Sequence, residues 1–182
     1  MKMTRNYLAL SLSILPSIVK GTSIAEKGQT VEFEVDNSLE EGEFFLLINL
    51  DVKEGKVNQI SPCLSESFKN RSMCDALLIY RPDDSSPIAV CFIELKTTSK
   101  QEEIKKQIEE AYRLIWKEKR LIQISSNPRF LCLYASQKAS PRKQDVQVEI
   151  EGKKFSLKPL RKSGRKFKLR QTVLNLLRKS NR

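Results

Sequence analysis

Histidine is absent from this chain of 182 residues. Its absence excludes the Ser-His and Cys-His nucleophile systems, the commonest general base and most catalytic zinc sites. Any catalysis would therefore depend on carboxylates, lysine, tyrosine or a metal ion held by oxygen atoms.

Cysteines are few, and no two of the four, at positions 63, 74, 91 and 132, have the short spacing of a zinc knuckle or a redox motif. Cys74, Cys91 and Cys132 each lie within an apolar run that is typical of a strand. We expect reduced thiols in the core of a cytoplasmic protein, with disulfides as the alternative.

No apolar run is long enough to span a membrane. The nearest candidate, residues 7–19, follows two basic residues near the N-terminus and permits two interpretations. One is a secretory signal with a cleavage site after Ala25, although Lys20 interrupts the stretch before that site. The other, which we favour, is a buried or amphipathic helix with Thr4 as its N-cap and a bend or an end near Pro16.

Acidic residues are nearly absent from the end of the chain. Residues 151–182 contain twelve Lys or Arg and one acid, Glu151, whereas residues 1–150 contain 21 of each sign, so this segment carries the whole net charge of +11. Such a basic tract favours phosphate backbones or anionic lipid, and the alternative is a solubilising tail. Because apolar residues are interleaved and Val173 and Leu177 suggest a closing helix, we expect the segment to fold onto the body.

The whole chain is 40% hydrophobic and 30% charged, which is typical of one folded domain. A helix is predicted at residues 99–120, where Ser99 and Glu102 have the spacing of a capping box. Alternating apolar and polar residues, or short apolar runs, predict strands at 30–35, 43–52, 74–80, 88–95 and 129–136. They also predict a hairpin at 146–157 around Gly152. This order predicts an α/β sheet with helices packed on its faces.

Two of these strands bring acidic residues together. If 74–80 and 88–95 form an antiparallel hairpin centred on the bond between residues 84 and 85, Asp75 faces Glu94 with Cβ atoms about 5 Å apart. Lys96 follows Glu94 by two residues and lies on the same face if the extended geometry continues. The sequence therefore predicts three ionisable groups at one end of an apolar hairpin.

Two carboxylates this close repel each other unless a cation lies between them, and oxygen ligands suit Mg²⁺ or Mn²⁺. Such an ion would lower the pKa of a bound water and stabilise the charge of phosphoryl transfer. The ammonium group of Lys96 would hold or activate the attacking water. The alternative is an ion pair between Lys96 and Asp75 or Glu94, without a metal.

The segments CDALLIY and CFIELK, followed by a helix carrying KKQIEEAY, resemble the PD-(D/E)XK nuclease superfamily over residues 74–134. The resemblance implies a restriction-endonuclease-like fold, a mixed central sheet of about four to five strands flanked by helices. It also implies that Asp75, Glu94 and the backbone carbonyl of Leu95 hold the metal, and that Lys96 is the catalytic lysine.

The resemblance further implies a catalytic role for Gln107, whose alternative role is an amide at the edge of the core. We expect a nuclease core at residues 1–150 and a basic segment at 151–182 packed on it. The residues expected to contact nucleic acid are Lys158, Arg161, Lys162, Arg165, Lys166, Lys168 and Arg170.

The expected function is Mg²⁺- or Mn²⁺-dependent hydrolysis of phosphodiester bonds, with DNA favoured over RNA as substrate, in nucleic-acid defence or repair. Two alternatives stay open: a nucleic-acid-binding subunit of the same fold that does not cleave, and an exported basic protein. A homodimer or membership of a larger complex is expected as well, and a membrane partner is not.

Overall fold

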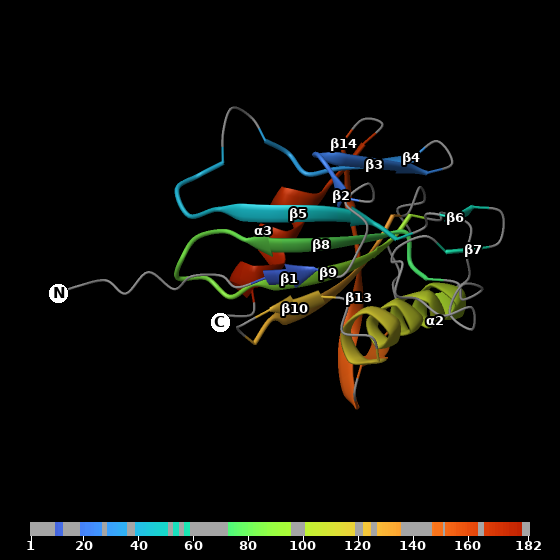
Figure 1. Ribbon diagram of the computed structural model, residues 1–182. Coiled ribbons are helices and arrows are strands. Elements are labelled where there is room, and N and C mark those ends of the chain that lie inside the picture. The colour runs from blue at the N-terminus through green and yellow to red at the C-terminus, as the bar shows by residue number, and fades with distance from the viewer. Residues whose placement is uncertain are drawn as a thin grey trace.

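A seven-stranded mixed sheet forms the centre of the structure, with strand order β12-β13-β11-β9-β8-β5-β2 (Figure 1). The computed structural model describes residues 10–12, 19–26, 29–35, 39–50, 53–54, 57–58, 73–95, 101–118, 122–124, 127–135, 147–150, 152–163 and 166–179. Two short sheets lie outside the centre: β1 (Leu10–Leu12) pairs with β10 (Ile122–Ile124), and β6 (Lys53–Glu54) pairs with β7 (Val57–Asn58).

Three strands form an antiparallel meander in the middle of the sheet: β5 (Phe44–Asn49), β8 (Ala76–Arg81) and β9 (Ala89–Glu94). Every residue of β9, and every residue of β8 before Arg81, is buried. Strands covered on both faces are expected to be continuously apolar, which is how the sequence of these two strands appears.

The other strands of the sheet run parallel to β9 or lie at an edge. The helix α2 (Gln101–Tyr112) and a π-helical continuation, η2 (Arg113–Glu118), connect β9 to its parallel neighbour β11 (Arg129–Tyr134). Next come β13 (Lys153–Pro159), parallel to β11, and the edge strand β12 (Gln147–Ile150), which forms the predicted hairpin with β13. The φ angle of 74° at Gly152 permits the turn.

Helix α2 covers one face of the central sheet. The predicted inner stripe of the helix is buried, at Ile104, Ile108, Ala111 and Ile115. These side chains belong to one apolar cluster with Phe92 and other residues of the sheet. The predicted cap at Ser99 lies outside the described residues.

A second sheet, of order β14-β15-β4-β3, and helix α3 cover the opposite face (Figure 1). Its elements are β3 (Ser23–Glu26), β4 (Gln29–Glu32), β14 (Arg161–Ser163), β15 (Lys166–Lys168) and α3 (Leu169–Lys179). Phe167, Val173 and Leu177 are buried here, so the expected closing helix is confirmed, and the described part of the basic segment packs on the body of the protein.

The N-terminal helix prediction is wrong where the structure describes that stretch. Residues 10–12 form β1 and residues 19–20 form β2 (Val19–Lys20), which pairs with β5 at the edge of the central sheet. Short apolar runs have no period that separates a strand from a buried helix, and pairing partners distant in sequence decided the outcome. Thr4 and Pro16 lie outside the described residues.

The predicted mixed α/β fold, with a central sheet and flanking helices, is confirmed. The sheet is larger than expected because the hairpin of β12 and β13 and the strand β2 extend it. The boundary expected after residue 150 falls within that hairpin, both strands of which belong to the sheet. Within the described residues, no helix has the length and apolar character needed to cross a membrane.

The start of α3 is capped by a residue distant in sequence. The backbone N–H of Arg170 donates to the carboxylate of Glu34 at 2.7 Å, and this negative charge also stabilises the positive end of the helix dipole. We therefore expect Glu34→Ala to lower the free energy of unfolding by about 1 kcal/mol, measured by urea denaturation. Glu34→Gln keeps an acceptor oxygen and should lose less, and equal losses for the two variants would contradict the capping role.

Candidate active site

The β8–β9 hairpin has the predicted register. Ala76 pairs with Ile93 and Tyr80 pairs with Ala89, and the same register places Asp75 opposite Glu94 immediately beyond the first of these pairs. The prediction depended on the position of the turn, since a slip of one residue would have moved one of the two acids to the other face.

Side-chain alternation places both acids on the face covered by α2. Leu77 in β8 and Phe92 in β9 pack in the cluster beneath α2, whereas Ala76 and Ile93 pack on the opposite face. Side chains two residues apart in a strand lie on the same face. Asp75 therefore lies on the same face as Leu77, and Glu94 lies on the same face as Phe92.

The carboxylate of Asp75 is held in place by the backbone. The residue is only 1% exposed, and Oδ2 accepts a hydrogen bond of 2.6 Å from the backbone N–H of Leu95. The carbonyl of Asp75 accepts from the backbone N–H of Leu50 at 2.9 Å. The two bonds join the beginning of β8 to the residues that follow β5 and β9. The bond from Leu95 also fixes the orientation of the carboxylate.

Glu94 is completely buried at the end of β9. Its carbonyl accepts from the backbone N–H of Ala135 at 2.8 Å, which anchors the strand end to the chain after β11. The pKa of the nearby Cys74 thiol is raised well above its ordinary value, first by burial and then by the negative charges of Glu94 and Asp75. Both carboxylates therefore lie close enough to Cys74 to act on the same thiol.

Helix α2 brings Gln107 to the same end of the sheet. The backbone carbonyl of Gln107 accepts a hydrogen bond of 3.2 Å from the backbone N–H of Cys74, the residue that precedes Asp75. Gln107 is buried, with 7% of the residue exposed. Gln107, a polar residue on the inner side of α2, therefore lies beside the start of β8. Its position in the sequence of the helix is equally typical of an amide at the edge of the core.

The available ligands suit a hard divalent ion. Asp75 and Glu94 provide carboxylate oxygens from adjacent strands, and the predicted third ligand is the carbonyl of Leu95, all oxygen donors of the kind that Mg²⁺ and Mn²⁺ prefer. In the described part of the chain, no three His, Cys, Asp or Glu side chains are grouped to hold a metal, so this set has two acidic side chains. Lys96 lies outside the described residues.

The predicted nucleic-acid contacts differ in their surroundings. Lys168 is exposed, and Lys158 is half-buried in β13. Lys166 forms an ion pair of 3.0 Å with Glu32 on the neighbouring strand β4. Arg161 and Lys162 lie on β14, whose side chains, like the whole of Arg165, are outside the described set.

Arg170 forms a buried network that sequence reasoning missed. Its Nε and one terminal guanidinium nitrogen each donate to a different carboxylate oxygen of Glu43, both at 2.8 Å, and the hydroxyl of Tyr80 donates to Glu43 at 2.7 Å. Because the guanidinium already neutralises a buried carboxylate, Arg170 has less positive charge to offer a phosphate than an unpaired arginine would. No local motif links these residues, since 127 positions separate Glu43 from Arg170.

The network shifts the pKa values of its members. Burial raises the pKa of Glu43, but hydrogen bonds from the backbone of Glu40, from Tyr80 and from Arg170 outweigh it, so the net pKa is lowered. Burial and the neighbouring Glu43 carboxylate raise the pKa of Tyr80. The stable state at neutral pH is therefore an ionised glutamate between a protonated tyrosine and an arginine.

The structure thus brings together three of the four predicted catalytic residues, Asp75, Glu94 and Gln107, at one end of the central sheet. The Glu43 network lies near the other end of β8, at Tyr80, and is separate from this site. Comparison of the chain with protein-family models, with curated proteins and with solved structures gave no match.

Proposed function

We propose that this chain is a Mg²⁺-dependent nuclease of the PD-(D/E)XK type, which hydrolyses phosphodiester bonds, in DNA rather than RNA. The observation that carries the proposal is the burial of Asp75 and Glu94 opposite each other at the end of β8 and β9, on the face covered by α2. Two adjacent buried carboxylates repel each other and lose hydration, so a bound cation would stabilise them.

In this proposal, Asp75, Glu94 and the carbonyl of Leu95 hold the divalent ion. When bound, the ion would supply a water of lowered pKa and positive charge for the phosphoryl group. The hydrogen bond from the Leu95 N–H fixes the orientation of the Asp75 carboxylate, which would hold the ion. Lys96 holds the attacking water and neutralises developing charge, and Gln107 positions the water or the phosphate from α2.

Digestion assays test the proposal directly. Linear duplex DNA, circular DNA, single-stranded DNA and RNA are incubated with the full chain in Mg²⁺, in Mn²⁺ and in EDTA. We expect DNA products only with a divalent ion, and cutting of circular DNA would identify an endonuclease. The absence of products from every substrate with both metals would contradict the proposal.

A second candidate is a nucleic-acid-binding subunit that does not cleave, favoured by the net charge of +11 on residues 151–182. Wild-type protein that binds DNA tightly in Mg²⁺ but yields no product would support it. A role in cytoplasmic defence or repair, as a homodimer or within a larger complex, fits either candidate.

The basic segment gives a separate prediction. We expect Lys168→Gln to reduce the salt dependence of duplex DNA binding, lowering the slope of log K against log salt concentration by about 0.9 for one lost phosphate contact. Lys166→Gln should have a smaller effect because Glu32 already pairs with Lys166. Filter binding between about 50 and 200 mM salt measures both slopes, and an unchanged slope for Lys168→Gln would exclude this contact.

A further inference from the structure

The candidate site lies in a row of residues that crosses the central sheet from β5 to β11. Tyr134, the last residue of β11, pairs with Glu94 at the end of the parallel strand β9. The register of β8 and β9 places Asp75 on the other side of Glu94. The backbone N–H of Leu50, just beyond β5, donates to the carbonyl of Asp75. The order across the sheet is therefore Leu50, Asp75, Glu94 and Tyr134.

Tyr134 lies on the same face of the sheet as the two acids. It packs against the apolar cluster beneath α2, to which Phe92, two residues before Glu94, also belongs. The carbonyl of Tyr134 accepts a hydrogen bond of 2.8 Å from the backbone N–H of Leu160, which fixes the end of β11 on its other side. Since neighbouring strands lie about 4.8 Å apart, a tyrosine side chain is long enough to reach the carboxylate of the residue with which it pairs.

The composition of this row limits what can orient the carboxylate of Glu94. Glu94 is completely buried, and buried polar side-chain atoms are hydrogen-bonded in the large majority of cases. On one side of it, Asp75 cannot donate a hydrogen bond while it is ionised, whereas on the other side the hydroxyl of Tyr134 can. The Asp75 carboxylate has its own fixed donor in the backbone N–H of Leu95.

We propose that Tyr134 is a positioning residue of the metal site, whose hydroxyl donates to the Glu94 carboxylate and fixes its orientation. The inference rests on the metal site of the proposed function. Groups that hydrogen-bond the ligands of a metal typically change metal affinity or activity by about 10- to 100-fold when they are removed. Tyr134→Phe keeps the ring that packs on the cluster and removes only the hydroxyl.

Titration of the full chain with Mg²⁺ alone tests the inference without DNA. The thermal midpoint, measured over a range of Mg²⁺ concentrations, gives the Kd, because an ion that binds only the folded state stabilises it. We expect Tyr134→Phe to raise the Kd by at least about 10-fold. Its cleavage rate should be low near the wild-type Kd and should recover as Mg²⁺ approaches saturation. A loss of packing alone would lower the midpoint without metal and leave the Kd unchanged.

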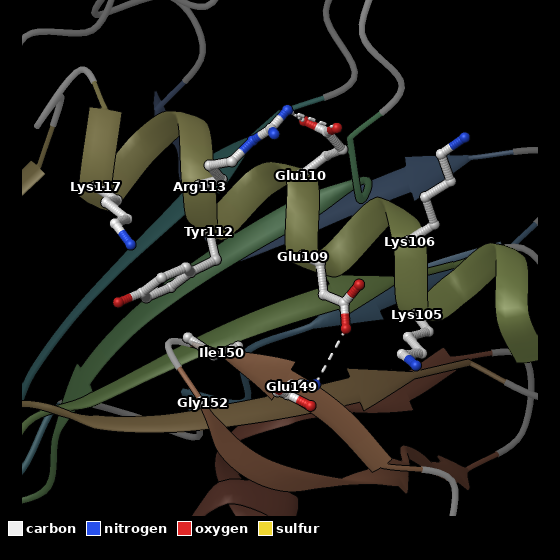
Figure 2. A pocket seen from close by; sticks show the side chains of 10 residues that line it. All are labelled: Lys105, Lys106, Glu109, Glu110, Tyr112, Arg113, Lys117, Glu149, Ile150 and Gly152. Atoms are coloured by element: carbon white, nitrogen blue, oxygen red, sulfur yellow. Dashed lines mark hydrogen bonds and ion pairs between the residues drawn. The ribbon is translucent and has the colours of Figure 1, made fainter.

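Tyr112→Phe is the matched control, because it removes the same hydroxyl group from the same apolar cluster. The Tyr112 ring contacts Phe92 and Phe130, which lie deeper in the sheet than the two acids. Figure 2 shows the Tyr112 hydroxyl directed toward Lys117, and both residues line the groove between the α2–η2 helix and the β12–β13 hairpin. This variant should therefore keep the wild-type Kd for Mg²⁺.

An unchanged Kd in Tyr134→Phe would overturn the inference and favour Gln107 as the donor to Glu94. An equal rise of the Kd in Tyr112→Phe would overturn it as well. If the wild type cleaves DNA and Tyr134→Phe binds Mg²⁺ normally, the role of Tyr134 is wrong and the nuclease stands. If Tyr134→Phe loses Mg²⁺ affinity and the wild type never cleaves, the positioning role stands and the nuclease is wrong.

Discussion

Substitution of Glu94 by glutamine is expected to lower the rate of Mg²⁺-dependent DNA cleavage by at least about 100-fold. Glutamine keeps the size of the side chain and removes its charge, so the metal loses an anionic ligand while the buried strand end keeps its packing. Cleavage rates are measured under single-turnover conditions. The affinity of the variant for DNA should stay close to that of the wild type. Glu94 is completely buried and contributes no charge to the surface.

A second measurement separates loss of the metal from a general defect. A ligand that binds only the folded state stabilises it, by about 2.7 kcal/mol at a concentration 100 times its Kd. Titration with Mg²⁺ should therefore raise the thermal midpoint of the wild type and have little effect on Glu94→Gln.

Glu41→Gln is a suitable control, because it removes an exposed carboxylate before β5 and should keep both the cleavage and the response to Mg²⁺. A Glu94→Gln protein that cleaves at the wild-type rate would refute the assigned role. A variant that is inactive but stabilised by Mg²⁺ as strongly as the wild type would show that the metal binds elsewhere.

The register of the candidate site could be predicted because its determinants are local. The Asp83 carboxylate accepts hydrogen bonds from the backbone N–H and the hydroxyl of both Ser85 and Ser86, which fixes the turn between β8 and β9. Turn residues of this kind and two apolar runs of matching length specify how the strands pair. The opposition of Asp75 and Glu94 follows from that pairing.

Features that depend on distant contacts could not be predicted in the same way. Leu10 pairs with Ile124, and Val19 pairs with Ile48, so the N-terminal apolar stretch forms strands for reasons located elsewhere in the chain. Arg170 lies among basic residues that suggest a solvent-facing tract, yet its guanidinium reaches a buried carboxylate near the start of β5. Charge composition describes a segment but does not identify the partners of its individual side chains.

Replacement of Arg170 by methionine is expected to lower the free energy of unfolding by about 3 kcal/mol at neutral pH. The side chain of Glu43 is only 1% exposed, and without Arg170 it would be a buried charge with its main counter-ion removed. We expect a value at the low end of the range for buried pairs, because the Arg170 side chain is 16% exposed. Urea denaturation of the two proteins measures the difference.

The same network predicts how stability depends on pH. Since the folded-state pKa of Glu43 is below its ordinary value of 4.5, the unfolded chain binds a proton first as the pH falls, and stability is lost from about 4.5 downward through the lowered pKa. Arg170→Met should reduce this acid-dependent loss, because it removes hydrogen bonds and a charge that hold the pKa of Glu43 down. Lys168→Met removes an exposed charge two residues away and should change stability by less than about 0.5 kcal/mol. Equal losses of stability in the two methionine variants would contradict the stabilising role of the buried pair. The same would follow if Arg170→Met lost stability between neutral and acid pH as steeply as the wild type does.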